Sequence, residues 1–201
     1  MKVTGFGVAL ALTAALVATS AVAQAPQVVR VRATIESVNG SMLDVKGRDG
    51  TSMKVQLAPN ASVSEIVKTS LSDIKEGSYI AITAMPQPDG SQKAMAILIF
   101  PPGAHPGEGF HPWDYSPNST MTNATVANEV SSVDGKTLTV KYAGGEKKIV
   151  VPSDCVIVNS KKATAAALKP GQKIFIFAAK KQPDGSLQAP NLAFGDYGVW
   201  R

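Results

Sequence analysis

The sequence is short of the residues on which most catalytic and redox chemistry depends. It has one cysteine, Cys155, so no disulfide can form within the chain, even in an oxidising compartment. Cys155 begins an apolar run, residues 155–158, without a basic or helix-terminal setting, and we interpret it as a small buried residue rather than a reactive thiol. No Ser/His/Asp order, nucleophile elbow, cysteine pair or phosphate-binding glycine loop occurs in a credible context. We therefore expect a protein that is not an enzyme.

Hydrophobic runs long enough to cross a membrane are also missing. The apolar run at residues 8–17 falls short of the ~20 residues that a spanning helix needs, which weakens the alternative of a membrane anchor. It follows the charged Lys2 and precedes Ala-Val-Ala at residues 21–23, an order typical of a secretory signal peptide. We expect cleavage before Gln24, which removes residues 1–23. The mature protein is then periplasmic or secreted, without a transmembrane segment.

What the chain does have is an internal repeat. Gln-Pro-Asp-Gly-Ser occurs at residues 87–91 and again at residues 182–186, and 182 − 87 = 95. Asp-Gly supplies the positive φ with which a chain reverses between two strands, and the preceding proline sets the approach. The same step of 95 residues links Val-Asn-Gly at 38–40 to Val-Asp-Gly at 133–135, and Leu-Asp-Val-Lys at 43–46 to Leu-Thr-Val-Lys at 138–141. One β module is therefore written twice.

Each copy predicts the same order of elements. Apolar and charged residues alternate over residues 29–36, which indicates a strand with one face in a core. Two further strands follow, the third ending at Pro59, then a short helical turn near residues 70–77, and then a hairpin across the Pro-Asp-Gly turn. Three strands, a short helix and two strands is the order of an OB-like barrel. We predict an all-β fold of two tandem five-stranded OB-like barrels, each with one short helix, joined by a Pro-rich connector. The modules are residues 24–100 and 124–201, and the connector is residues 101–123.

These motifs resemble a family of uncharacterised secreted bacterial domains with OB-like β-barrel modules. The resemblance rests on the Val-Asn/Asp-Gly and Leu-x-Val strands, the Leu/Ile-x-x-Gly before a strand, and Pro-Asp-Gly-Ser before the last strand. It covers residues 28–100 and 124–195, and residues 107–114 and 119–124 are similar to the spacer of two-module members. The resemblance implies the fold and export, but no activity, because the family has none established.

The connector differs in composition from both modules. It holds five prolines, both histidines and three aromatic residues, a density of Pro and Gly that argues against helix or central strand. One interpretation is that its aromatic side chains pack between the barrels and fix their relative angle. The other is that they line a binding surface at the module junction, and the two are compatible. The predicted binding residues are Phe110, His111, Trp113, Asp114 and Tyr115.

The same connector carries an alternative function. His105, Glu108 and His111 are metal-ligand types spaced three residues apart, with Asp114 at the next step. On a helix they would share a face, but Pro106 argues against a helix here. We expect no cofactor; the alternative is a soluble periplasmic metal-handling protein that binds a divalent transition metal through the connector histidines.

Charge is concentrated in the second module. Residues 124–201 carry 11 basic and 6 acidic groups, whereas residues 24–100 carry 8 and 7. A basic OB-like barrel would suggest nucleic acid inside a cell, but export favours an anionic envelope component or a partner protein, and not nucleic acid. An alternative interpretation is that the lysines of this module form a face that only aids solubility. The sequence does not assign a role to the tail that carries Trp200. The sequence therefore predicts an exported, non-enzymatic binding or interaction protein of the cell envelope.

Overall fold

The computed structural model of the chain describes residues 27–132, 135–195 and 198, except for the side chains of residues 129–135. The predicted signal peptide and the Trp200 tail lie outside the described residues. Among the described residues, no helix has the length and apolar character that crossing a membrane requires. The strands are β1 (Val28–Asn39), β2 (Met42–Gly47), β3 (Ser52–Lys68), β4 (Tyr79–Pro86), β5 (Gln92–Ile99), β6 (Gly109–Pro112), β7 (Thr120–Ser132), β8 (Gly135–Tyr142), β9 (Gly145–Pro152), β10 (Val156–Ala163), β11 (Lys173–Lys181) and β12 (Leu187–Phe194).

Five of these strands close into a mixed β-barrel, which we name the first barrel. β1, β2, β3, β12 and β11 pair in that order, and β11 pairs back onto β1. All neighbours are antiparallel except β3 and β12, which run parallel. Val31, Ala33 and Ile35 are buried in the barrel core, as the alternation in the sequence predicted. The all-β fold is confirmed, with the other seven strands outside this ring.

The strands of the first barrel come from both sequence repeats. β1, β2 and β3 belong to the first copy, whereas β11 and β12 lie at the end of the second copy. The prediction that residues 24–100 close into a barrel by themselves is therefore wrong. The β11–β12 hairpin, which is the repeat equivalent of the β4–β5 hairpin, covers the edges of β1 and β3. The repeat boundaries at residues 100 and 124 stay a prediction about the sequence.

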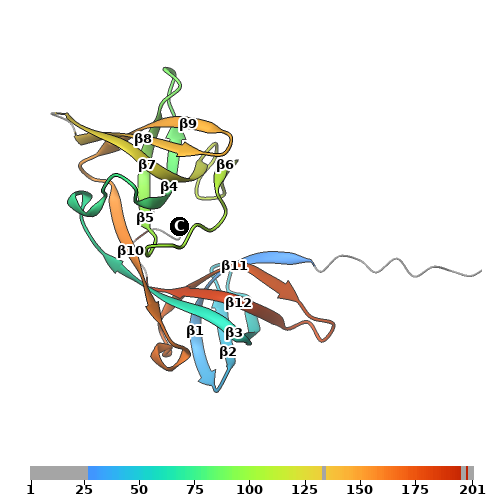
Figure 1. The fold of residues 1–201 in the computed structure, drawn as a ribbon. Coiled ribbons are helices and arrows are strands. Elements are labelled where there is room, and N and C mark those ends of the chain that lie inside the picture. The colour runs from blue at the N-terminus through green and yellow to red at the C-terminus, as the bar shows by residue number, and fades with distance from the viewer. Residues whose placement is uncertain (1–26, 133–134, 196–197, 199–201) are drawn as a thin grey trace, which may run out of the picture.

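The β4–β5 hairpin of the first copy lies in the second lobe, which is formed by β4 to β9 (Figure 1). β7, β8 and β9 pair in order, β4 pairs with β7, and β5 pairs with β4. A short parallel contact between β5 and β9 spans two residue pairs. The inward rows of these strands form a separate core that includes Ile80, Ile82, Ile97, Leu138, Val140 and Ile149. The second lobe therefore repeats the strand order of the first barrel, again with strands from both copies.

β3 and β10 connect the two lobes as an antiparallel pair (Figure 1). Val63 pairs with Ala163 and Lys68 pairs with Val158. Val158 is the repeat equivalent of Val63, because 63 + 95 = 158, and Ala163 is the repeat equivalent of Lys68, because 68 + 95 = 163. The repeat therefore relates one end pair of the crossing to the other, which gives the crossing internal two-fold symmetry. The sequence predicted that the third strand ends at Pro59. It continues instead to Lys68, because β10 supplies hydrogen-bond partners that a free end would lack.

The short helices predicted in each copy are single 3₁₀ turns, η1 (Leu71–Asp73) and η2 (Ala165–Ala167). The prediction of a helix is corrected to this extent, because three residues make only one turn. The residue after each turn is buried in a core: Ile74 in the second lobe and Leu168 in the first barrel. Each turn therefore lies next to the core of the lobe that contains the hairpin following it.

The Pro-Asp-Gly turns form as predicted. Gly90 and Gly185 have φ angles of 82° and 83°, which favour glycine. The Asp89 carboxylate accepts hydrogen bonds from the hydroxyl and the backbone N–H of Ser91, at 2.6 and 3.0 Å. Asp184 makes the same two contacts with Ser186. These hydrogen bonds, the hydroxyl's above all, lower the pKa of both carboxyl groups from its ordinary value.

The connector is shorter than the sequence predicted. It contains β6, which pairs with β7 and is an edge strand, a position that its terminal Pro112 tolerates. β7 already begins at Thr120, because residues 120–123 pair with both β4 and β6. The segment between β6 and β7, residues 113–119, is the part of the connector that reaches toward the first barrel.

Candidate functional site

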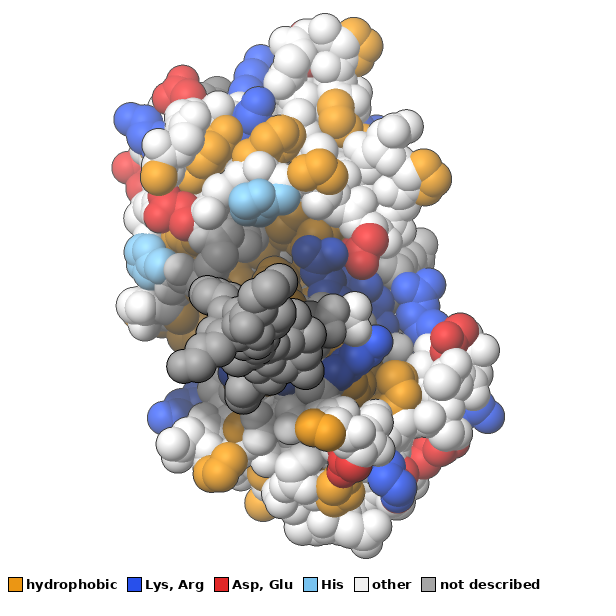
Figure 2. Space-filling view, turned by 90° about the vertical axis from the view of Figure 1, so that its right-hand side faces the viewer, with side chains coloured by type: hydrophobic (Ala, Val, Ile, Leu, Met, Phe, Trp, Pro, Cys, Tyr) orange, Lys and Arg blue, Asp and Glu red, His pale blue; other side chains and the backbone are white. Residues whose placement is uncertain are grey.

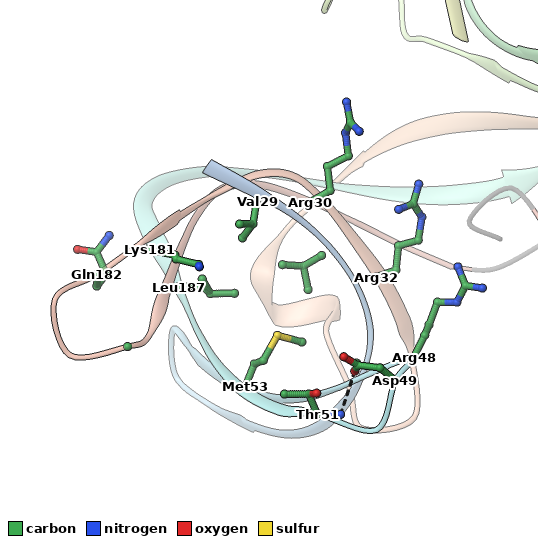
Figure 3. Close-up of a pocket in the computed structure, with 13 residues that line it drawn as sticks. Val29, Arg30, Arg32, Arg48, Asp49, Thr51, Met53, Lys181, Gln182 and Leu187 are labelled. Atoms are coloured by element: carbon green, nitrogen blue, oxygen red, sulfur yellow. Dashed lines mark hydrogen bonds between the residues drawn. The ribbon is translucent and has the colours of Figure 1, made fainter. Parts of the chain in front are cut away.

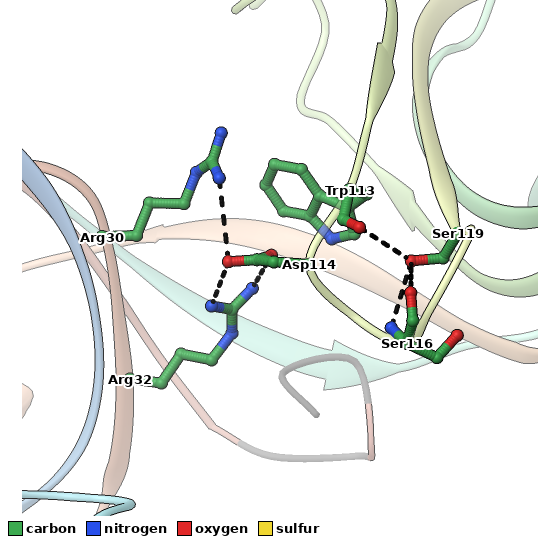
Figure 4. Close-up of polar contacts among 6 residues, drawn as sticks. All are labelled: Arg30, Arg32, Trp113, Asp114, Ser116 and Ser119. Carbon is green, nitrogen blue, oxygen red and sulfur yellow. Dashed lines mark hydrogen bonds and ion pairs between the residues drawn. The ribbon is translucent and has the colours of Figure 1, made fainter.

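Two features stand out where the first barrel faces the second lobe. Figure 2 shows Lys and Arg side chains gathered in the indented middle of one face, between the lobes. One feature is the open end of the first barrel (Figure 3). The other is a group of side chains between the lobes, which we name the junction cluster. Its members are Arg30 and Arg32 of β1 and Trp113 and Asp114 of the connector, which Figure 4 shows, together with Phe175 and Phe177 of β11.

The strands of the first barrel place four members of the junction cluster. Val29 and Val31 line the barrel end, so the alternation of β1 directs Arg30 and Arg32 outward. Arg32 lies directly opposite Phe175 in the β1–β11 ladder, and opposed residues share a face of the sheet. Two arginines and two phenylalanines therefore lie on the outer face of the barrel.

A tight loop brings the other two members from the second lobe. The N–H of Trp113 donates to the carbonyl of Ser119 at 2.8 Å, and the Ser119 hydroxyl donates to the carbonyls of Trp113 and Ser116 at 3.1 and 2.7 Å (Figure 4). Asn118 has a φ of 63°, which its short amide side chain tolerates. These contacts fix the loop backbone and thus the positions of Trp113 and Asp114.

Asp114 joins the loop to the first barrel. Its carboxylate accepts two hydrogen bonds from the Arg32 guanidinium, at 3.0 and 2.8 Å, and lies 3.7 Å from Arg30 (Figure 4). The hydrogen bonds from Arg32, followed by the charges of both arginines, hold the pKa of Asp114 below its ordinary value. The side chain of Arg32 is 13% exposed, whereas that of Arg30 is 42% exposed. The two arginines therefore differ: Arg32 is committed to Asp114, and Arg30 faces solvent.

Aromatic rings surround both guanidinium groups. Arg30 lies 4.4 Å from the ring centroid of Trp113 and 5.6 Å from that of Phe177, while Arg32 lies 4.9 Å from that of Phe175. Trp113 and Phe177 are nearly parallel, with centroids 6.1 Å apart. Phe177 is 45% exposed, which is unusual for a phenylalanine in a strand. The junction cluster thus presents an exposed cation beside an exposed aromatic face.

The predicted binding residues do not all converge here. Trp113 and Asp114 belong to the junction cluster, and the Tyr115 hydroxyl donates to the carbonyl of Gly198 at 3.0 Å. Phe110 instead contacts Lys147 of β9, whose ammonium lies 4.5 Å from its ring centroid, and His111 is exposed on β6. The idea that connector aromatics hold the two lobes together therefore agrees with Trp113, and not with Phe110.

The predicted metal ligands are engaged separately. The His105 ring stacks on Tyr79 with centroids 4.4 Å apart, and the Glu108 carboxylate accepts a hydrogen bond from the N–H of Ala143 at 2.8 Å. Among the described residues, no group of three or more His, Cys, Asp or Glu side chains is placed to hold a metal ion. The metal alternative required His105, Glu108 and His111 to converge, and the structure gives it no geometric support.

The open end of the first barrel was not anticipated from the sequence. It is a groove of about 660 Å³, lined by the start of β1, the turn between β2 and β3, and the turn between β11 and β12. Val29, Met53 and Leu187 lie within the ring of strands, whereas Arg30, Arg32 and Arg48 point away from it (Figure 3). The sequence signal that was missed is the same for both features. Alternating Val and Arg at the start of β1 place apolar groups inside the barrel and cations outside.

Cys155 agrees with its interpretation as an unreactive residue. It packs against the core of the second lobe and is half-buried. Burial, aided by the negative charge of Asp154, raises the pKa of the Cys155 thiol to about 12. The thiol is therefore protonated at neutral pH and is a poor nucleophile.

Comparisons with known proteins provide no information about these features. No protein-family model matches the chain, and no match to it was found among curated proteins or solved structures. The resemblance to secreted OB-like domains therefore stays an expectation.

Proposed function

We propose that the protein is an exported, non-enzymatic binding protein of the cell envelope, in the periplasm or outside the cell, and that the junction cluster binds its ligand. The observation that carries this proposal is the state of Arg30. Its guanidinium is 42% exposed and packs against Trp113 and Phe177. The only carboxylate within ion-pair distance of it among the described residues is Asp114, which already accepts two hydrogen bonds from Arg32.

The charge balance of the junction cluster favours an anionic ligand. Two guanidinium groups share one carboxylate, so the cluster carries a net charge of 2 − 1 = +1. Arginine presents planar donors that match a carboxylate or phosphate, and stacking on aromatic rings holds those donors in place. The exposed face of Phe177 adds a flat apolar surface beside the cation. An acidic polysaccharide combines both requirements, because its sugar rings present apolar C–H faces that stack on aromatic side chains and its acid groups recur.

The architecture supports the same class of function. We propose that the second lobe is a barrel of the same kind as the first, and that both are OB-like. The support is the common pairing pattern. Each lobe has three antiparallel strands and one hairpin, and the second strand of the hairpin runs parallel to the third of the three strands. OB folds bind oligosaccharides and oligonucleotides on their surfaces. The predicted export favours the former.

Binding of the mature chain to soluble polygalacturonate, measured by calorimetry at low and high salt, tests the proposal. Replacing Arg30 by Ala should weaken binding about tenfold or more, because a charge-assisted contact contributes about 1.5–3 kcal/mol. Replacing Phe177 by Ala should also weaken binding, because the apolar surface beside the cation is lost. Arg30→Lys should restore part of the affinity at most, since an ammonium lacks the planar donors. Lys169→Ala is the matched control, because it removes an exposed cation after η2 and should change little.

Two results would overturn the proposal. One is binding that Arg30→Ala and Lys169→Ala weaken equally, which would mean diffuse charge rather than a site. The other is a mature chain that does not bind the polyanion and that binds vesicles equally well with and without anionic lipid. Preferential binding to anionic vesicles that depends on Arg30 would keep the site and identify lipid head groups as the envelope component.

A further inference from the structure

The open end of the first barrel is a separate site, next to the junction cluster. Its groove of about 660 Å³ falls in the size range of small-molecule sites, about 300–1,000 Å³. Val31 and Leu187 are buried at its floor, and Val29 and Met53 are half-buried above them. Apolar side chains of β1, β3 and β12 line this end of the barrel (Figure 3).

The strand register places one cation over this apolar floor. Lys181 pairs directly with Leu187 across the β11–β12 hairpin, and directly opposed residues point to the same face of a sheet. Since Leu187 is buried inside the barrel, Lys181 also points toward the barrel end, as Figure 3 shows. Its neighbour Lys180 pairs with Gln188 and points to the other face. The two adjacent lysines therefore differ in access to the groove.

The surroundings of the groove are positive. Its lining residues include Arg30, Arg32, Arg48 and Lys181 but one acid, Asp49. The Asp49 carboxylate accepts a hydrogen bond from the N–H of Thr51 at 3.0 Å, and this contact lowers the pKa of Asp49. Because Arg30, Arg32 and Arg48 point away from the ring of strands, Lys181 is the lining cation that is directed at the groove. No carboxylate among the described residues forms an ion pair with Lys181 or Arg48. An apolar floor under a positive rim complements an apolar group that carries an acid.

We propose that the open end of the first barrel binds a single-chain anionic amphiphile. The alkyl chain occupies the groove against Val29, Met53 and Leu187, and the acidic head group contacts Lys181. This site goes beyond the proposed polysaccharide site: its ligand is a small molecule, and its contacts do not include Trp113 or Phe177.

Dodecyl phosphate, used below its critical micelle concentration, is the probe. The mature chain should bind it, as measured by calorimetry, while inorganic phosphate and dodecyltrimethylammonium should bind at least about tenfold more weakly. In a chain labelled at the methionine methyl groups, the Met53 resonance should shift on titration. The Met42 resonance should not, because Met42 lies at the opposite end of β2.

Matched variants locate the head group. Lys181→Glu should weaken dodecyl phosphate binding about tenfold or more, whereas Lys180→Glu should leave it within about twofold, since charge-assisted contacts act at hydrogen-bond distance. Met53→Glu should abolish binding. If the Met53→Glu variant unfolds, the comparison of Lys181→Glu with Lys180→Glu still decides the outcome, because both lysines are exposed. Equal effects of the two lysine variants, an unchanged Met53 resonance, or equal binding of the cationic amphiphile would overturn the proposal. Arg30 is unchanged in all these variants, so the polysaccharide site can fail independently.

Discussion

Arg32 and Asp114 lie 82 residues apart in the chain, and the guanidinium of one donates two hydrogen bonds to the carboxylate of the other. Arg32 belongs to the first barrel, whereas Asp114 projects from a loop of the second lobe. The pair is therefore a contact between lobes, and it holds Trp113 of the same loop over Arg30. It also leaves Arg30 as the cation open to a ligand.

Asp114→Asn tests this contact through its pH dependence. The folded-state pKa of Asp114 is lowered, so the ion pair stabilises the protein above the unfolded pKa of about 3.9, and this contribution is lost as pH falls through the folded pKa. The variant should lower the free energy of unfolding at pH 7 by about 1 kcal/mol or less, because the carboxylate is 46% exposed and solvent screens the pair. Urea unfolding at pH 7 and at about pH 2 measures the difference, which should decrease at the lower pH. A difference that is equally large in acid would point to a packing role for Asp114 instead.

Ile74→Ala tests which lobe each hairpin serves. Ile74 precedes β4 in the first repeat, but its side chain is fully buried in the second lobe. Its truncation should cost about 2–5 kcal/mol of the free energy of unfolding, as buried Ile-to-Ala changes do. In amide NMR spectra the shifts should change in β8 and β9 and stay the same in β2. Perturbation of β2 would mean that Ile74 packs within its own repeat.

Cys155 offers a chemical test of burial. With its pKa raised to about 12, the native thiol should react with iodoacetamide at pH 8 more than about a hundredfold more slowly than in denaturant, where an unperturbed thiol has a pKa near 8.5. Mass spectrometry of the alkylated chain gives both rates. A native rate equal to the denatured rate would show that the β10 end of the second lobe is open.

Local features of the fold follow from the sequence because each depends on a few neighbouring residues. The burial of Val31, Ala33 and Ile35 follows from a period of two, and the reversals at Gly90 and Gly185 follow from turn chemistry. These signals are the same in both copies. They therefore do not say whether a hairpin pairs with its own copy or with the other one.

The exchange between copies depends on contacts that have no local signal. β3 continues past Pro59, where its pairing with β12 is irregular, and then pairs with β10, which connects it to the other lobe. The site shows the same limit. Trp113 and Asp114 stood out by composition, but their partners Arg30 and Phe177 are ordinary strand residues until the β1–β11 pairing brings them together.

Cleavage of the connector tests the exchange most directly. A protease site inserted between Pro102 and Gly103, both exposed, allows the native chain to be cut into its two repeats. The Asp114→Asn background removes the ion pair between the lobes, so that strand pairing and the shared cores are the main contacts that hold the pieces. We predict that the two fragments stay in one complex on size-exclusion chromatography and separate only in denaturant, because β1 pairs with β11, β3 with β12 and β10, and β4 with β7. Fragments that separate without denaturant would contradict the exchanged architecture.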